Sequence, residues 1–297
     1  MPVVTSNGMS LAYDEFGDAA NPPIVLIMGL GTQMIAWSEP FCEALAARGF
    51  RVIRFDNRDI GLSTKLDKAP AVSVGAAIFK AWMGKPVEAP YTLDDMAADA
   101  VGLFDALGLD KVHVVGASMG GMIAQIVAAR YPQRVLSLTS IMSSSGRPDL
   151  PQAKPRVTLA MLGARPKEGD RKGAIAQGMK VYRAIGSRGF PAGEAELRQL
   201  IARFYDRSYY PAGVARQLMA IIASGSRVDL LPTIKAPTLV LHGEDDPLVP
   251  IDAGRDMAAL IPGAVLKTIP GWGHDLPPAI QPILVAAIAN HCHSHDA

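Results

Sequence analysis

Residues 112–125 read VHVVGASMGGMIAQ, and this stretch decides the fold. An apolar run typical of a buried strand leads directly into a Gly-x-Ser-x-Gly pattern, and a helix-like segment follows. A sharp turn between a strand and a helix strains the residue at its apex, and glycines at positions 116 and 120 remove the side chains that would collide there. The sequence therefore predicts that the hydroxyl of Ser118 stands clear of a sheet, in the place of a nucleophile.

Short apolar runs alternate with longer helix-like segments along most of the chain, which is typical of βα units and a mostly parallel sheet. We expect strands at residues 10–16, 24–27, 51–55, 112–115, 136–142, 238–241 and 264–269. The first of these should pair with the opening residues as an antiparallel start. Residues 92–107 predict a helix, with Thr92 as N-cap and Asp95 as its reciprocal carboxylate. The predicted fold class is α/β, with a central sheet flanked by helices.

The pattern changes between Gly146 and Arg227, where polar helical pieces punctuated by Pro and Gly replace the strand series. We expect an α/β core formed by residues 1–146 and 228–297, with residues 147–227 inserted as a helical cap. A smaller excursion at residues 65–90 contains an apolar segment that is too short to span a bilayer. A helix packed beside the cap is preferred over attachment to a membrane surface, because the segment lacks a strongly basic face.

The bulk composition points to a small, weakly charged ligand. The 297 residues include 29 basic and 28 acidic side chains, so there is no electrostatic reason to expect nucleic acid or an anionic membrane as a partner. The first eight residues lack the features of a secretory signal and no apolar run reaches transmembrane length, so a cytoplasmic location is expected.

The cysteines and the histidine-rich tail predict no metal or disulfide framework. Two cysteines do not build such a framework in a domain of this size, and Cys42 is interpreted as a structural thiol. The tail at residues 291–295 matches no closed zinc pattern.

A serine hydroxyl needs an imidazole to accept its proton and a carboxylate to orient that imidazole. In folds with this strand-turn-helix serine, the acid and the histidine follow on loops at the carboxyl ends of later strands, in that order. We expect Asp246 to be the acid because it directly precedes a chain-stiffening proline; Asp245 and Glu244 are weaker alternatives. His274, on a Gly-rich loop after the last strand, is the expected base.

The other internal histidines and the oxyanion donors complete the expected site. His113 is interpreted as a satisfied core histidine, and His242 as a side chain that holds loop backbone. A tetrahedral intermediate needs two fixed N–H donors. We expect them to be the backbone N–H groups of Met119, which opens the helix after the serine, and of Leu30, in the loop after residues 24–27.

With these residues in hand, the chain resembles the α/β-hydrolase superfamily over nearly its full length. It is more narrowly similar to the esterases that look like aclacinomycin methylesterase and related carboxylesterases. The likeness is carried by Met28-Gly29, by residues 55–63 (FDNRDIGLS) and by residues 114–121 (VVGASMGG). It implies the triad Ser118, Asp246 and His274, with no metal or organic cofactor.

The loop at residues 55–63 departs from the commoner Asp-x-Arg-Gly-x-Gly-x-Ser pattern at Asp59. Asp56 and Arg58 are interpreted as structural residues that organise neighbouring backbone.

The predicted function is hydrolysis of carboxylic esters of small, fairly apolar substrates through an acyl-enzyme. Aromatic side chains of the cap and the smaller excursion are candidates to line the substrate pocket, with packing of the cap as the alternative role: Trp82, Phe204, Tyr205, Tyr209 and Tyr210. The same triad also serves aminopeptidases or amidases, carbon–carbon bond hydrolases and cofactor-free perhydrolases. A ligand receptor on a hydrolase fold is the non-enzymatic alternative.

Overall fold

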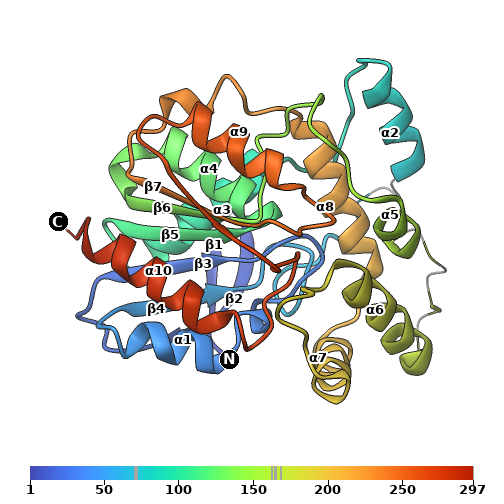
Figure 1. Cartoon of the computed structure of the whole chain (residues 1–297), viewed down its shortest axis with the longest axis horizontal. Coiled ribbons are helices and arrows are strands. Elements are labelled where there is room, and N and C mark those ends of the chain that lie inside the picture. The colour runs from blue at the N-terminus through green and yellow to red at the C-terminus, as the bar shows by residue number, and fades with distance from the viewer. Residues whose placement is uncertain (70–72, 162, 164–165, 168, 297) are drawn as a thin grey trace.

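Eight strands form one central sheet in the computed structural model, which describes residues 1–69, 73–161, 163, 166–167 and 169–296 (Figure 1). The strands are β1 (Val3–Ser6), β2 (Met9–Phe16), β3 (Pro23–Ile27), β4 (Arg51–Phe55), β5 (Val112–Ala117), β6 (Val135–Ile141), β7 (Thr238–Gly243) and β8 (Val265–Ile269). Their order in the sheet is β1-β2-β4-β3-β5-β6-β7-β8. β2 runs antiparallel to both of its neighbours, and all later pairs are parallel. The predicted α/β fold with a mostly parallel sheet is confirmed.

Helices cover both faces of this sheet (Figure 1). One face packs against α3 (Leu93–Ala106), α4 (Met119–Arg130) and α9 (Ile251–Leu260). The other face packs against α1 (Glu39–Ala46) and α10 (Gln281–His293). Because both faces are covered, all six residues of β5 are buried, which explains the unbroken apolar run that precedes the serine.

Local capping signals set the bounds of α3 as the sequence predicts. The Thr92 hydroxyl accepts a hydrogen bond from the backbone N–H of Asp95, and the Asp95 carboxylate accepts one from the backbone N–H of Thr92. These two bonds satisfy donors that have no partner inside the helix.

Four helices lie between β6 and β7: α5 (Pro155–Met161), α6 (Arg171–Ile185), α7 (Glu194–Arg207) and α8 (Pro211–Ser224). The described residues of this segment contain no strand. The two ends of this segment lie next to each other, because the backbone N–H of Arg227 donates to the carbonyl oxygen of Ser145 at 2.7 Å. We propose that residues 147–227 form the cap, and use that name for them.

The smaller excursion contains α2 (Val74–Trp82), which contacts α8 beside the cap. Only Ala77 of this helix is buried, so α2 lies where the sequence suggests but leaves its large apolar side chains in solvent. Within the described ranges, no helix is both long and apolar enough to cross a membrane. Three single-turn 3-10 helices complete the fold, at Met34–Ala36, Pro132–Arg134 and Leu231–Thr233.

Candidate active site

Ser118 sits at the apex of the turn between β5 and α4, with φ of 55° and ψ of −120°. A positive φ is strained for a residue with a side chain, and the surrounding packing holds it there. The glycines of the motif permit that packing. A Cβ atom on Gly116 would lie 2.1 Å from the carbonyl oxygen of Gly120, and one on Gly120 would lie 2.1 Å from the carbonyl oxygen of Ile27.

Three side chains from three strand ends meet at this turn. His274, after β8, places Nε2 at 3.0 Å from Ser118 Oγ. Its Nδ1 lies 2.7 Å from Oδ2 of Asp246, which follows β7. The other carboxylate oxygen of Asp246 accepts the backbone N–H groups of Leu248 and Val249 at 2.9 and 2.8 Å, so the carboxylate is fixed. This arrangement can move a proton from the serine hydroxyl to the imidazole.

The alternative acids point away from this site. Glu244 and Asp245 are both exposed, and the Glu244 carboxylate accepts a hydrogen bond from the Thr268 hydroxyl on β8. Asp246 by contrast is buried together with His274.

The loop after β3 passes close to Ser118. A Cβ atom on Gly29 would lie 3.0 Å from Cβ and 3.6 Å from Oγ of Ser118, so the backbone directly before Leu30 comes close to the hydroxyl. Met119 is the first residue of α4, and the first N–H groups of a helix have no acceptor within it. The N–H of Met119, directly after Ser118, therefore lies at the positive end of the α4 dipole.

The remaining internal histidines have the structural roles that the sequence suggests. His113 is fully buried, and its ring nitrogens lie 2.8 Å from the Ser137 hydroxyl and 2.8 Å from the Asp296 carboxylate. His242 Nε2 donates to the carbonyl oxygen of Val249 at 2.8 Å and so holds the loop that carries Asp246. Burial lowers the pKa of both imidazoles. Among the described residues, no group of three or more His, Cys, Asp or Glu side chains could hold a metal ion.

A family model described as the alpha/beta hydrolase fold matches residues 22–277, a range that includes all three of these side chains. The chain belongs to the α/β-hydrolase fold family. Curated relatives that match over most of this chain include two methylesterases and several putative carbamate hydrolases. Rhodomycin D methylesterase DnrP of Streptomyces peucetius is 29% identical over 309 aligned residues, which cover 97% of each chain. The putative carbamate hydrolase RutD of Variovorax paradoxus is 30% identical, over 90% of each chain.

Solved structures agree with this membership. An esterase from Thermogutta terrifontis, solved with malate bound, superposes with a TM-score of 0.74 at 28% identity, over the whole of both chains. The meta-cleavage product hydrolase CumD of Pseudomonas fluorescens reaches a TM-score of 0.77 at 20% identity, a likeness of fold alone.

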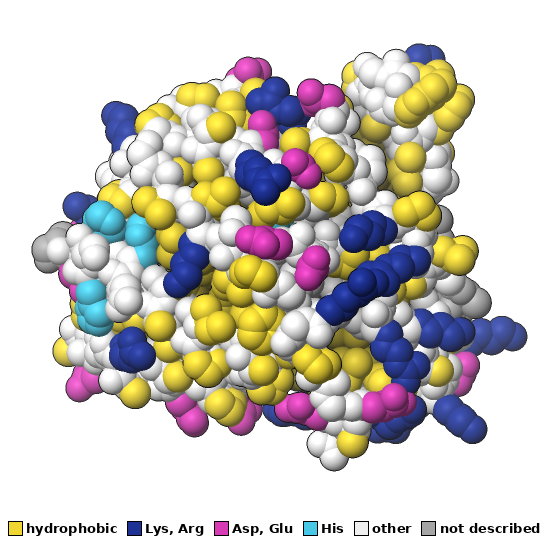
Figure 2. All heavy atoms as spheres, viewed as in Figure 1, with side chains coloured by type: hydrophobic (Ala, Val, Ile, Leu, Met, Phe, Trp, Pro, Cys, Tyr) yellow, Lys and Arg dark blue, Asp and Glu magenta, His cyan; other side chains and the backbone are white. Residues whose placement is uncertain are grey.

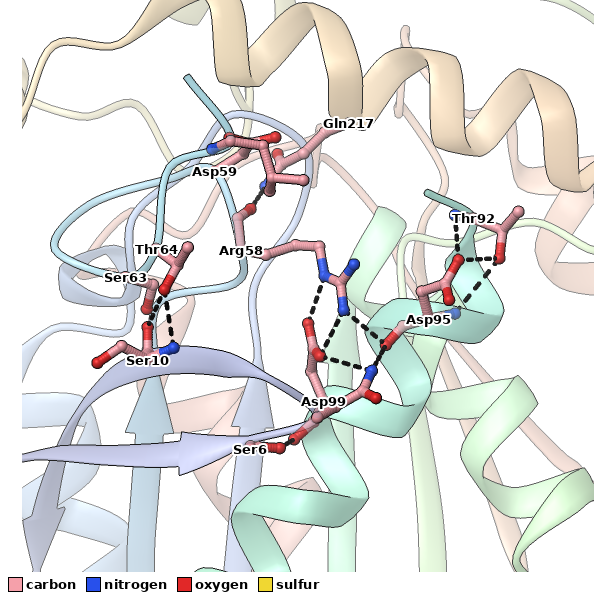
Figure 3. Close-up of polar contacts among 12 residues, drawn as sticks. Ser6, Ser10, Arg58, Asp59, Ser63, Thr64, Thr92, Asp95, Asp99 and Gln217 are labelled. Atoms are coloured by element: carbon pink, nitrogen blue, oxygen red, sulfur yellow. Dashed lines mark hydrogen bonds and ion pairs between the residues drawn. The ribbon is translucent and has the colours of Figure 1, made fainter. Parts of the chain in front are cut away.

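In this α/β hydrolase, the loop after β4 is an organising element rather than part of the reacting centre. Asp56 accepts the backbone N–H groups of Met34 and Leu62, and forms an ion pair with Arg207 of α7 at 2.7 Å. Arg58 forms a buried bidentate ion pair with Asp99 of α3, as Figure 3 shows. Their interpretation as structural residues is confirmed.

Asp59, the departure from the common pattern, ties the cap to the core. It is buried with φ of 67°, and its carboxylate pairs with Arg216 of α8 through two contacts of 2.8 Å. Gln217, the next residue of α8, donates to the carbonyl oxygen of Arg58 and accepts the N–H of Gly31 (Figure 3 shows Gln217 against the Arg58 backbone). The cap therefore braces the loop that holds Leu30. No local motif in the sequence marks Arg216 or Gln217, and both were missed.

A second missed contact joins the cap to the histidine loop. The backbone N–H of His274 donates to the carbonyl oxygen of Ile185 at 2.8 Å, and the N–H of Gly273 donates to the Ser187 hydroxyl at 2.9 Å. The Ser187 hydroxyl in turn donates to the carboxylate of Asp275. His274 is therefore held from the cap as well as from the core.

The candidate pocket aromatics do not form one cluster. Trp82 is 80% exposed at the end of α2, and its role in lining the substrate pocket stays a prediction. The Tyr210 hydroxyl lies 2.6 Å from both Arg216 and Asp67, which makes it part of the ion-pair network between cap and core. The rings of Tyr205 and Tyr209 pack at a 33° tilt with centroids 4.9 Å apart, and Phe204 of α7 is half-buried.

Proposed function

We propose that this α/β hydrolase cleaves carboxylic esters of small, fairly apolar substrates through an acyl-enzyme formed on Ser118. The observation that carries the proposal is the hydrogen-bonded chain from Ser118 Oγ through His274 to Asp246, with distances of 3.0 and 2.7 Å. The methylesterase relatives align over 97% of both chains and favour ester chemistry.

In the first half of the reaction, Ser118 Oγ attacks the ester carbonyl carbon while His274 Nε2 takes the hydroxyl proton. Nδ1–H of His274 donates to Asp246, which fixes the tautomer and stabilises the imidazolium. The imidazolium then gives its proton to the leaving alcohol as the C–O bond breaks. In the second half, water loses a proton to His274 and attacks the acyl carbon, and Ser118 recovers its proton.

The developing negative charge on the carbonyl oxygen is assigned to the backbone N–H groups of Leu30 and Met119. Removing one such donor commonly costs about 3 kcal/mol of transition-state stabilisation. The contact between Gly29 and Ser118 and the position of Met119 at the start of α4 support this assignment.

Relatives that are named for other reactions also match this chain. The putative carbamate hydrolases and the putative non-heme bromoperoxidases match about 90% of the chain, and a carbon–carbon bond hydrolase of Pseudomonas putida matches 90% at 27% identity. The methylesterases match more of the chain, and ester cleavage is the function that we retain.

The decisive experiment compares the wild type with Ser118→Ala on p-nitrophenyl esters of increasing acyl length and on methyl esters of varied acids. We expect turnover by the wild type and its loss in the variant. A fluorophosphonate should label the wild type once per chain, at Ser118 by peptide mass spectrometry. Unchanged turnover in Ser118→Ala contradicts the assigned nucleophile. A folded wild type that is neither labelled nor active supports the receptor alternative.

A further inference from the structure

Exposed apolar side chains gather on α2 and α5. Of the ten large hydrophobic residues that are exposed in the described part of the chain, six belong to α2, its C-cap or α5: Ile78, Phe79, Trp82, Met83, Leu159 and Met161. Trp82 is 80% and Leu159 is 76% exposed. Figure 2 shows the α2 group as a hydrophobic knob that stands out from the body of the molecule. Clusters of large exposed apolar side chains mark interaction sites.

The charges of the chain are segregated, although the whole chain carries a net charge of only +1. Residues 147–227 hold 15 Lys and Arg against 6 Asp and Glu, a net charge of +9. The rest of the chain holds 14 basic and 22 acidic side chains, a net charge of −8. In Figure 2, dark blue Lys and Arg side chains gather on the side of the molecule that bears the knob. The cap is thus a cationic surface next to an apolar projection.

We propose that α2, α5 and the cationic cap form a docking surface for an anionic lipid bilayer. Nine residues of helix extend only about 14 Å, too short to cross the hydrocarbon core, so α2 would lie within the interface. Trp82 is at the helix end, and tryptophan favours the headgroup level of bilayers. Lys80 on α2 and Arg156 on α5 are exposed cations on the same two helices.

In the fold, α2 lies next to charges that its own sequence does not contain. α2 alone lacks a basic face, which favoured simple packing against the cap. Its contacts with α8 place it beside the cap, however, and Figure 2 shows Lys and Arg side chains on the same side of the molecule as the α2 knob. A lipid surface with anionic headgroups complements both the apolar side chains and the positive field.

A second copy of this chain is a less suitable occupant. A two-fold contact through this face would bring the same patch of both copies together. Two cationic caps would then oppose each other, and like-charge juxtaposition disfavours such a contact. The charge distribution therefore favours an anionic surface over self-association.

Tryptophan fluorescence provides a direct test, because Trp37 and Trp272 are fully buried and Trp82 is exposed. We expect phosphatidylcholine vesicles that contain phosphatidylglycerol to shift the emission to shorter wavelength and to protect Trp82 from acrylamide. Pure phosphatidylcholine vesicles should have much less effect, and added salt should weaken the response. Sedimentation with the same vesicles measures the partition coefficient independently of fluorescence.

The variant Ile78→Glu/Phe79→Glu should lower partition into anionic vesicles at least about tenfold. Val3→Glu/Val265→Glu is the matched control with the same added charge, since Val3 on β1 is 54% exposed and Val265 on β8 is 60% exposed, both outside the docking surface. Both variants should retain activity on a soluble ester. The proposal is overturned if the wild type does not bind anionic vesicles or if Ile78→Glu/Phe79→Glu binds them as the wild type does. It is also overturned if sedimentation velocity shows a wild-type dimer that Ile78→Glu/Phe79→Glu converts to a monomer. None of these readouts requires turnover, so failure here is distinguishable from failure of the proposed esterase function.

Discussion

Ser187, in the connection between α6 and α7, hydrogen-bonds to Asp275, the residue that directly follows His274. The Ser187 backbone N–H donates to Oδ1 of Asp275 at 3.1 Å, and the Ser187 hydroxyl donates to the same carboxylate. Burial raises the pKa of the Asp275 carboxyl, and the hydrogen bonds from Ser187 oppose that rise. The cap therefore stabilises a buried charge next to the proposed catalytic base and helps to fix the position of its ring.

Ser187→Ala should reduce kcat/KM for a short ester about tenfold, mainly through kcat. Misplacement of a reacting group by a fraction of an ångström is enough for such a loss. Ser187→Thr keeps the hydroxyl and should restore most of the activity. Steady-state kinetics on both variants, with melting temperatures as a check of folding, measures the effect. If Ser187→Ala loses stability but keeps the wild-type kcat, the contact is structural only.

Asp246→Asn should lower kcat on the same esters by about four orders of magnitude. The amide that replaces Oδ2 cannot accept the Nδ1–H of His274, so the imidazole loses the tautomer that leaves Nε2 free for Ser118. The hydrogen bonds from the Leu248 and Val249 backbone can persist on the remaining oxygen, so the fold should be retained. Asp245→Asn, at the exposed neighbouring position, is the control and should remain fully active. Comparable losses in both variants would contradict the assignment of Asp246.

Local sequence signals predicted the parts of this site that depend on neighbours in the chain. The turn at Ser118 follows from glycines two residues away on either side, and the start of α3 follows from Thr92 and Asp95. Asp246 and His274 were identified because each follows its own strand, and parallel strands bring their carboxyl ends to one edge.

The contacts between cap and core were not predictable in this way. Asp59 and Arg216 are 157 residues apart, and Ser187 and Asp275 are 88 residues apart, with no periodic pattern that links them. Exposure of α2 was also missed. An apolar segment is consistent with burial or with an interaction surface, and only the arrangement of the neighbouring helices distinguishes them.

Asp59→Asn should destabilise the protein by about 3 kcal/mol or more, because it leaves the guanidinium of Arg216 buried without its counter-charge. Asparagine tolerates a positive φ as aspartate does, so the change tests the charge and not the backbone. Urea unfolding of Asp59→Asn, Arg216→Gln and the double variant gives the coupling energy. A double variant whose destabilisation equals the sum of the two single effects would show that the pair contributes no interaction energy of its own.

Gly120→Ala should destabilise the protein by about 3 kcal/mol and abolish activity, because its Cβ would lie 2.1 Å from the Ile27 carbonyl oxygen, a backbone atom. Gly75→Ala is the matched control. A Cβ on Gly75, within α2, meets no atom within 4 Å, and alanine favours a helix over glycine by about 0.5–1 kcal/mol. We expect thermal unfolding to separate the two variants clearly. Equal melting temperatures would contradict the close packing behind Ser118.

Acidification should destabilise the fold through its buried histidines. Burial lowers the pKa of His113 and His242 from the ordinary value of 6.5. As the pH falls through 6.5, the unfolded chain takes up protons at these positions while the folded chain stays neutral, so the free energy of unfolding decreases. The stability that these two neutral histidines contribute is fully present above pH 6.5. It is lost as the pH falls from 6.5 toward their lower pKa values in the folded chain.

The expected outcome is a lower urea midpoint at about pH 5.5 than at about pH 7.5 for the wild type. His113→Gln keeps a hydrogen-bonding side chain between Ser137 and Asp296 but does not titrate, so its midpoint should depend less on pH. The change of urea midpoint with pH can be compared between the two proteins even if His113→Gln is less stable at both pH values. Burial raises the pKa of the Asp99 and Asp275 carboxyls above the ordinary value of 3.8. Their contribution to the free energy of unfolding therefore decreases as the pH rises above about 3.8, which is opposite to the effect of the histidines. Since both proteins share these carboxyls, the difference between their slopes isolates His113, and identical slopes would show that its burial does not govern its protonation.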